Sequence, residues 1–255
     1  MSKFIKQAVL ALFVLAAACT NSPRKKLIAA GPPATKAVPS SATNTQIIHG
    51  YLVASYTVKD QQTYQRYRKM EESIAAKFRG KVILYDANTA PLEGNPLKVI
   101  DIIEFPSSNA AKHFYQSTDY APAKKDRVAS TEGWVLLAVS PPALLGQADS
   151  ITKYKNRSNG YLVVNYTISD PATFKKYMAA AGPLAQKFKG TVPIFDLKTQ
   201  RLEGNPYTVF GIAAFPLPAD AQRFYSSPEY TSARKFRTAA STGTNQLAST
   251  VPPSK

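Results

Sequence analysis

Cysteine is almost absent from this sequence of 255 residues, because Cys19 is the only one. A single thiol cannot form an intrachain disulfide, and it cannot build the thiolate zinc sites found in many small domains. Histidine is nearly as rare: His49 and His113 are too few for a three-histidine metal centre. We therefore expect no metal and no cofactor. Since 44% of the residues are hydrophobic, we expect a protein that folds around an apolar core.

Acidic residues are half as numerous as basic ones, 16 against 32, which gives a formal net charge of +16. Such a charge indicates nucleic-acid binding only where it is concentrated on one folded part. Here the segment 1–49 holds six lysines and arginines and no acid, and the remaining charge is spread along the chain. No segment contains a dense basic block, so we predict no nucleic-acid partner.

Motifs for several common chemistries are missing as well. The sequence contains no glycine-rich phosphate loop, no G-x-S-x-G nucleophile motif and no H-E-x-x-H zinc motif. No reaction can therefore be assigned from a motif.

The N-terminal segment has the composition of a secretory signal peptide. Lys3 and Lys6 give a positively charged start, and residues 8–18 form an apolar run. This run is too short to cross a bilayer as a helix, which needs about 20 residues. We therefore predict a signal peptide at residues 1–18.

The signal segment ends in Leu-Ala-Ala-Ala directly before Cys19. This sequence resembles the lipobox of bacterial lipoproteins, which implies cleavage before Cys19 and acylation of its thiol with chains such as palmitate. No acidic residue follows Cys19, so the usual signal for inner-membrane retention is missing. The resemblance implies a lipid anchor in the cell envelope and, in a bacterium with two membranes, the outer membrane facing the periplasm. The alternative is an ordinary secretory signal that happens to contain a cysteine.

Residues 19–46 are rich in Pro, Ala, Ser, Thr and Asn and show no apolar periodicity. This composition predicts a flexible tether behind the lipidated cysteine. Arg24, Lys25 and Lys26 lie close to the anchor, where they either contact anionic lipid headgroups or remain solvated in the linker.

The rest of the chain is a tandem duplication, in which Gly50 of the first copy corresponds to Gly160 of the second. Residues 50–140 and 160–250 share 37 identical positions of 91, including the segment LEGNP at 92–96 and again at 202–206. Two copies this similar must share one fold. We define repeat 1 as residues 47–140, the linker as 141–159 and repeat 2 as 160–250.

Each repeat predicts the order strand, helix, strand, strand, helix, strand, which is the ferredoxin-like (βαββαβ) arrangement of an α+β protein. A helix is expected to begin after Asp60 in repeat 1 and after Asp170 in repeat 2, and to stop at Gly80 and Gly190. Gly182-Pro183 predicts a bend in the helix of repeat 2. In repeat 1 the other expected elements are strands at 51–58, 81–88, 97–105 and 134–139, a turn at 89–95, a short helix at 108–116 and a helical or irregular stretch at 120–131. The last strand of repeat 2, at 244–249, is much more polar than its counterpart.

The first strand of each repeat is apolar on both faces. Leu52, Ala54 and Tyr56 alternate with Tyr51 and Val53, so a sheet covered by helices on one side still exposes an apolar face on the other. We predict that the two sheets pack face to face within one chain, as a pseudo-dimer, and that the protein is a monomer.

Several of the repeated segments carry a family resemblance. Four segments recur in both repeats: GYLV at the start of each repeat, the LEG turn, the Phe-Pro step after the third strand, and Phe-Tyr followed by Arg127 or Arg237. In these segments the chain resembles the domain-of-unknown-function 1330 family. The resemblance implies the dimeric α+β barrel fold, in which two ferredoxin-like units form one barrel. That superfamily includes cofactor-independent monooxygenases, haem-degrading enzymes, chlorite dismutase-like haem proteins and muconolactone isomerases. A glutamate is usual in the third strand; repeat 1 has Glu104 there, whereas repeat 2 has Ala214.

The repeated glutamates and arginines are the first candidate site residues. Glu93 and Glu203 either cap backbone amides and pair with an arginine, or act as general bases. Arg127 and Arg237 either pair with these glutamates or bind an anionic ligand through two hydrogen bonds. We favour a structural pair between Glu93 and Arg127, and likewise between Glu203 and Arg237.

A second group of candidates is expected between the sheets. It consists of Tyr51, Tyr161, Ser55, Asn165 and Glu104. Asp86 and Asp196 are interpreted as turn residues, and the aromatic residues of the short helices as core before ligand contacts. His49 aligns with Asn159 and His113 with Arg223. Both histidines are expected on the surface, away from the barrel interior.

Three functions remain open. The first is an envelope lipoprotein that binds a small anionic or aromatic molecule, or an envelope component, between the sheets. The second is a cofactor-independent enzyme of the monooxygenase or isomerase type. The third is an envelope interaction module whose basic surface meets an anionic polymer or a protein partner. We favour the first, without catalysis.

Overall fold

The computed structural model describes residues 48–139 and 159–249. The predicted signal peptide, the lipidation site, the tether and nearly all of the linker lie outside these residues. Within the described ranges, no helix combines the length and the apolar character needed to cross a membrane.

The two repeats contain the same elements in the same order. Repeat 1 comprises β1 (Gly50–Val58), α1 (Gln61–Lys77), β2 (Lys81–Asp86), β3 (Ala90–Glu93), β4 (Val99–Phe105), α2 (Ser108–Gln116), α3 (Ala121–Ser130) and β5 (Thr131–Val139). Repeat 2 comprises β6 (Gly160–Ile168), α4 (Pro171–Lys187), β7 (Thr191–Asp196), β8 (Gln200–Glu203), β9 (Val209–Phe215), α5 (Pro218–Ser226), α6 (Pro228–Ala240) and β10 (Ser241–Ser249). The ferredoxin-like order is confirmed, with a second helix before the last strand of each repeat.

The long helices begin as the sequence predicts. The Asp60 carboxylate accepts hydrogen bonds from the backbone N–H groups of Gln62 and Thr63, at 3.0 and 3.2 Å, and Asp170 does the same for α4. The helix α4 continues through Pro183 to Lys187.

The helix ends differ from the prediction by one residue. Arg79 and Lys189, not the following glycines, adopt the left-handed conformation, with φ of 60° and 61°. Gly80 and Gly190 are required for another reason: a Cβ atom would lie 2.4 Å from the Phe105 ring and 2.5 Å from the Phe215 ring, respectively. The glycines therefore allow the sheet and the helix to pack closely.

Each sheet has five strands, and the fifth comes from the other repeat. The first sheet has the order β2-β4-β1-β5-β8 and the second β3-β10-β6-β9-β7. The expected turn at 89–95 is wrong in part, because Ala90–Glu93 forms β3, which pairs antiparallel with β10 of repeat 2. In return, β8 pairs with β5 of repeat 1. The exchange covers an edge strand of each sheet, whose backbone groups would otherwise lack partners.

The exchange explains why the LEG turn recurs with its glycine. Gly94 and Gly204 have φ of 65° and 61°, which glycine adopts without strain. A Cβ atom on Gly94 would lie 2.6 Å from the Gly243 carbonyl oxygen, and one on Gly204 would lie 2.2 Å from that of Gly133. Each turn therefore contacts a glycine on the last strand of the other repeat. Because β10 pairs with both β6 and β3, this polar segment forms a strand of nine residues.

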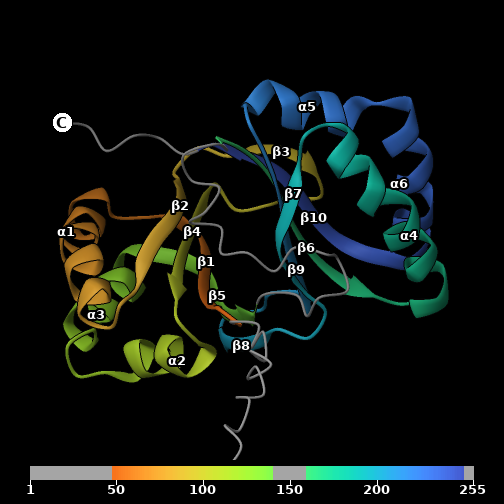
Figure 1. Ribbon diagram of the computed structural model, residues 1–255. Helices are drawn as coiled ribbons and strands as arrows, with labels where there is room; N and C mark the ends of the chain where they lie inside the picture. Colours follow the sequence, from red (N-terminus) through yellow and green to blue (C-terminus); the bar gives the residue numbers. More distant parts are fainter. Residues whose placement is uncertain (1–47, 140–158, 250–255) are drawn as a thin grey trace, which may run out of the picture. The chain divides into compact units, whose positions relative to one another are not determined.

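The two sheets pack face to face, as predicted, with helices on their outer faces (Figure 1). Tyr51, Val53 and Leu136 of repeat 1 share one hydrophobic core with Tyr161 and Phe210 of repeat 2. The opposite faces of the sheets form two further cores against the helices, one in each repeat. The fold is thus a pseudo-dimer of two ferredoxin-like repeats.

Candidate functional site

The repeated glutamates and arginines form ion pairs between the repeats. Arg237 Nη2 donates to Glu93 Oε1 and Oε2 at 2.6 and 2.7 Å, and Arg127 donates to Glu203 from Nη1 and Nη2 at 2.9 and 2.6 Å. The prediction that Glu93 pairs with Arg127 within one repeat is therefore wrong. The exchanged strands β3 and β8 end at these glutamates, and they carry each carboxylate into the other repeat.

These carboxylates are almost fully engaged. Tyr225 donates to Glu93 at 2.6 Å, and Tyr115 donates to Glu203 at 2.5 Å. Burial favours a higher pKa for both glutamates, but the hydrogen bonds from arginine and tyrosine outweigh it and hold each pKa below its ordinary value. Neither glutamate is suited to act as a general base, and the arginines are occupied by them rather than free for an anionic ligand.

A cavity of about 380 Å³ lies between the two sheets. Aromatic side chains line it from both repeats: Trp134 on β5 and Phe210 on β9 have ring centroids 6.5 Å apart in an edge-to-face arrangement, and Tyr207 lies in the loop before β9. Amide side chains contribute hydrogen-bonding groups, from Asn165 and Gln246 on the strands and from the two turns that follow LEG. We call this space the inter-sheet cavity; it is lined by Ser55, Gly94, Asn95, Pro96, Leu97, Trp134, Val163, Asn165, Asn205, Tyr207, Phe210, Thr244 and Gln246.

Asn165 holds one wall of the inter-sheet cavity. Its Nδ2 donates to the backbone oxygens of Val209 and Tyr207 at 2.7 and 3.1 Å, and its Oδ1 accepts from the Tyr207 N–H at 3.0 Å. In repeat 1 the equivalent Ser55 donates to the Val99 oxygen at 2.8 Å. Both residues line the cavity, but their main hydrogen bonds stabilise the cavity wall.

All side chains in the described lining of the inter-sheet cavity are uncharged. Its polar groups are amides, hydroxyls and one indole N–H, and the described lining includes no carboxylate, ammonium, guanidinium, imidazole or thiol. Gln246 Oε1 lies 3.3 Å from Thr89 Oγ1, which is consistent with a hydrogen bond between the repeats. Such a surface can hold a neutral ligand by ring contacts and hydrogen bonds, but it offers no strong acid or base.

The remaining candidates lie elsewhere on the inter-sheet face. Tyr51 and Tyr161 are fully buried in the core that the sheets share, and burial raises the pKa of Tyr161 to about 12. Glu104 is buried near the end of β4, with Oε1 3.6 Å from Nδ1 of His49. His49 is thus half-buried rather than exposed as expected, whereas His113 is exposed on α2.

Neither histidine lines the inter-sheet cavity, so neither fits the role of an axial haem ligand there. Among residues 48–139 and 159–249, no group of three or more His, Cys, Asp and Glu side chains is placed to hold a metal ion.

Sequence patterns did not indicate the aromatic part of the site or a charged cluster in repeat 1. Trp134, Tyr207 and Phe210 differ from their counterparts in the other repeat, so repetition between the two copies does not mark them. The missed cluster lies beneath α1, where Arg68 contacts both Glu71 and Asp101. The sequence feature that could have indicated this cluster is Glu71, an acidic residue on the same buried face of α1 as Tyr64 and Tyr67.

Comparison with known proteins supports the fold. A family model described as a domain of unknown function, DUF1330, matches residues 49–140 and 159–251. A search of curated proteins found no match to this sequence.

Solved structures resemble the chain at very low identity. A protein provisionally assigned as a chlorite dismutase has a TM-score of 0.51 and 10% identity, and the match covers 80% of this chain and 95% of that one. A point variant of chlorite dismutase from Candidatus Nitrospira defluvii has a TM-score of 0.50 and 9% identity, with 81% and 92% covered. An anthrone oxidase-like protein has a TM-score of 0.48 and 10% identity, with 80% and 92% covered. At these identities the likeness to the two chlorite dismutase-like structures shows the dimeric α+β barrel fold alone.

Proposed function

The chain belongs to the DUF1330 family, and from that premise we propose that it is a binding module for an uncharged, ring-containing small molecule. The ligand occupies the inter-sheet cavity. The observation that carries this proposal is the cavity lining, which combines aromatic rings and amides from both repeats with no charged side chain. A volume of about 380 Å³ lies within the usual range of ligand pockets, about 300–1,000 Å³.

Ring contacts and hydrogen bonds supply different parts of the recognition. The Trp134 and Phe210 rings provide a surface on which a flat ring packs, and edge-to-face aromatic pairs contribute about 0.5–1.5 kcal/mol beyond the area that they bury. The amides of Asn95, Asn205 and Gln246 supply donors and acceptors. A charged ligand would have to give up its hydration without a counter-charge, so we expect the site to reject acids and amines.

The enzyme alternative has less support at this cavity. A monooxygenase- or isomerase-type reaction that moves a proton needs a group with a pKa near the working pH, positioned at the substrate. Tyr207 is the only ionisable side chain in the described lining. The lining therefore favours binding over acid–base catalysis.

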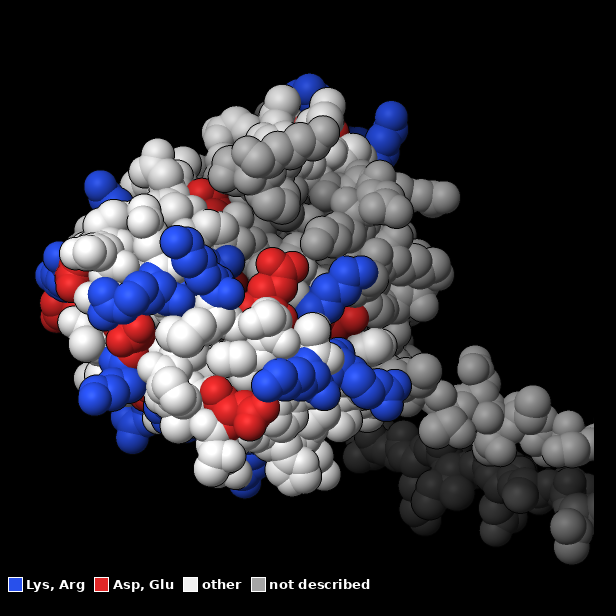
Figure 2. Space-filling view, turned by 90° about the vertical axis from the view of Figure 1, so that its left-hand side faces the viewer, with Lys and Arg blue, Asp and Glu red and all other residues white. Residues whose placement is uncertain are grey.

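The interaction-module alternative rests on the basic surface. Figure 2 shows the helical side of repeat 1, where basic and acidic side chains are interspersed. Ion pairs such as Lys77–Asp119 at 2.9 Å and Lys59–Glu132 at 3.0 Å partly neutralise this surface. A mixed surface favours a small-molecule ligand over an acidic polymer, and the absence of a nucleic-acid partner stays a prediction.

We also propose that the binding module is attached to the cell envelope through a lipid on Cys19, with the outer membrane as its location. The support is the lipobox-like sequence before Cys19. A tethered module of this kind would bind its ligand near the membrane surface.

The single tryptophan makes the binding proposal testable, because Trp134 lines the inter-sheet cavity. Full-length protein in detergent is titrated with uncharged aromatic amides and with the matching carboxylic acids, and the tryptophan fluorescence is recorded. We expect a saturable change with amides and none with acids. Tyr207→Ala should weaken binding, while Phe236→Ala, an exposed aromatic residue on α6, should not. Equal responses to both ligand classes, or no response to either, would count against the proposal.

A further inference from the structure

The two repeats differ in charge beneath their long helices. In repeat 1 the space under α1 holds a cluster of charged and hydroxyl side chains. Arg68 contacts Glu71 and Asp101, the Tyr67 hydroxyl donates to Glu71, and the Arg68 guanidinium lies 3.9 Å from the centre of the Tyr85 ring. This network fills the space between the helix and the sheet.

Repeat 2 has none of these charges at the equivalent positions. The alignment of the two repeats places Met178, Ala181 and Gly211 where repeat 1 has Arg68, Glu71 and Asp101, and it places Phe195 where repeat 1 has Tyr85. Three charged side chains of repeat 1 thus correspond to two apolar side chains and a glycine in repeat 2. The Phe195 ring covers Gly211, since a Cβ atom there would lie 2.7 Å from it, but the space next to Ala181 stays open.

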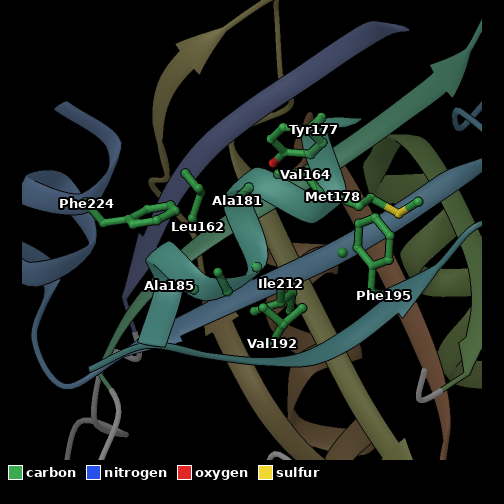
Figure 3. Close-up of a pocket in the computed structure, with 13 residues that line it drawn as sticks. Leu162, Val164, Tyr177, Met178, Ala181, Ala185, Val192, Phe195, Ile212 and Phe224 are labelled. Carbon is green, nitrogen blue, oxygen red and sulfur yellow. The ribbon is translucent and has the colours of Figure 1, made fainter. Parts of the chain in front are cut away.

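The result is an apolar pocket of about 80 Å³ between α4 and the sheet, which we call the α4 pocket. Figure 3 shows Tyr177, Met178 and Ala181 on α4 facing side chains of the strands β6, β7 and β9. Leu162, Val164, Val192 and Phe195 are among those strand residues. The pocket lies on the helix side of the repeat 2 sheet, and no residue of the inter-sheet cavity lines it.

The α4 pocket offers almost no hydrogen-bonding group. Tyr177 carries the only side-chain hydroxyl in its described lining, and this oxygen lies 3.2 Å from the Tyr230 hydroxyl, with which it shares a hydrogen bond. An apolar cavity of this kind holds water poorly and takes up apolar molecules instead. Met178 at its wall is unbranched and flexible, so it can adapt to the shape of an occupant.

We propose that the α4 pocket is a second binding site, which takes the end of a linear alkyl chain from an uncharged small molecule. The size of the pocket selects the chain over a ring, because an apolar cavity that binds benzene has a volume of about 150 Å³. The charged cluster of repeat 1 excludes the same ligand from the equivalent place, so one chain carries one such site. The polar end of the ligand remains in water at the opening.

The methionines provide a reporter for this site. The sequence contains only Met1, Met70 and Met178; Met178 lines the α4 pocket, and Met70 lies on α1 of repeat 1. Full-length protein labelled with ¹³C at the methionine methyl groups is titrated with linear alcohols of four to eight carbons. We expect a saturable shift of the Met178 signal, with Met70 and the Trp134 fluorescence unchanged. Affinity should rise about fourfold for each added methylene until the pocket is full.

Two variants test the location of the binding. Ala181→Leu fills the pocket from the helix, and Ala213→Ile fills it from β9 with the residue that repeat 1 has at the equivalent Ile103. Each should raise the alcohol concentration at half-saturation at least tenfold. Ala179→Leu, on the exposed side of the same helix, should leave it unchanged.

The outcomes distinguish this site from the inter-sheet cavity. Absence of a Met178 shift, equal shifts at Met70 and Met178, or unchanged binding in a folded filling variant would overturn the proposal. A failure of the ring-containing ligands to change Trp134 fluorescence would bear on the inter-sheet cavity alone. Ala213→Ile keeps the test decisive if Ala181→Leu does not fold, since its side chain enters from a strand.

Discussion

Arg237 in repeat 2 donates from one nitrogen to both carboxylate oxygens of Glu93 in repeat 1, at 2.6 and 2.7 Å. The guanidinium is buried, with 3% of its side chain exposed, and the carboxylate is 23% exposed. The pair therefore joins two halves of the chain that are 144 positions apart in sequence. Arg127 and Glu203 form the reciprocal link.

Removing one member of a pair should destabilise the whole protein. Glu93→Ala leaves a buried guanidinium without its partner, so we expect a loss of about 3 kcal/mol in the free energy of unfolding, measured with urea at pH 7. Glu203→Ala should have a similar effect. Glu229→Ala removes the exposed pair with Lys187 and should change stability far less than Glu93→Ala does. Unchanged stability in both Glu93→Ala and Arg127→Ala would instead favour a ligand-binding role for these residues.

The same pairs should make stability fall in acid. The pKa values of Glu93 and Glu203 are below their ordinary values in the folded protein. Their contribution is therefore present above the unfolded pKa, about 4.3, and is lost as the pH falls through the folded values. The double variant Glu93→Gln/Glu203→Gln should be less stable at pH 7 and should lose less stability between pH 5 and 3. The measurement is urea unfolding across this range, and parallel curves for the two proteins would contradict the prediction.

The buried Glu71 should behave in the opposite way. Burial and the nearby charge of Asp101 raise its pKa well above the ordinary value. Its stabilising contribution is present at low pH and is lost as the pH rises through the raised pKa. Because Gln does not titrate, Glu71→Gln should flatten the fall in stability that follows as the pH rises above the unfolded pKa of about 4.3, measured by urea unfolding.

Asp101→Asn is the matched comparison, since it removes the carboxylate next to Arg68. We expect it to cost about 3 kcal/mol, measured by urea unfolding in parallel with Glu71→Gln. Equal losses for the two variants would show that both carboxyls carry the charge that Arg68 needs.

Lipidation at Cys19 is tested by mass. The lipobox-like sequence predicts a mature chain that begins at Cys19 and carries a diacylglycerol and a further acyl chain. Intact mass spectrometry of the membrane-extracted protein should show this form. Cys19→Ala should leave a protein without the lipid mass, and an unmodified wild-type chain cleaved at another position would refute lipidation.

A monomer is expected because the exchanged strands are paired within one chain. β3 already pairs with β10 and β8 with β5, so these strands of one chain take the places that strands of a second copy would take in an exchange between chains. Light scattering in detergent, corrected for bound detergent, should give the mass of one lipidated chain at micromolar concentration. A dimer that separates only on unfolding would mean that the repeats pair between chains in solution.

Local sequence patterns were sufficient for most of the elements. Asp60 and Asp170 marked the helix starts, and the alternation around Leu52 and Val53 indicated a sheet that is buried on both faces. The duplication then transferred each assignment from one repeat to the other. These features depend on short-range hydrogen bonding and side-chain periodicity, which are visible in a single strand or helix.

Tertiary structure decided which residues meet. Nothing local to Glu93 distinguishes Arg127 from Arg237 as its partner, because the two arginines occupy equivalent positions in the two repeats. The exchange of β3 and β8 makes the choice. The inter-sheet cavity likewise combines Trp134 of one repeat with Phe210 of the other. The α4 pocket exists because residues on α4 and β9 that are smaller than their counterparts in repeat 1 meet at one place in the folded protein. Sequence alone determined the elements and their duplication, whereas the partners across the repeats depend on long-range packing, in which each contact forms only when the whole fold is in place.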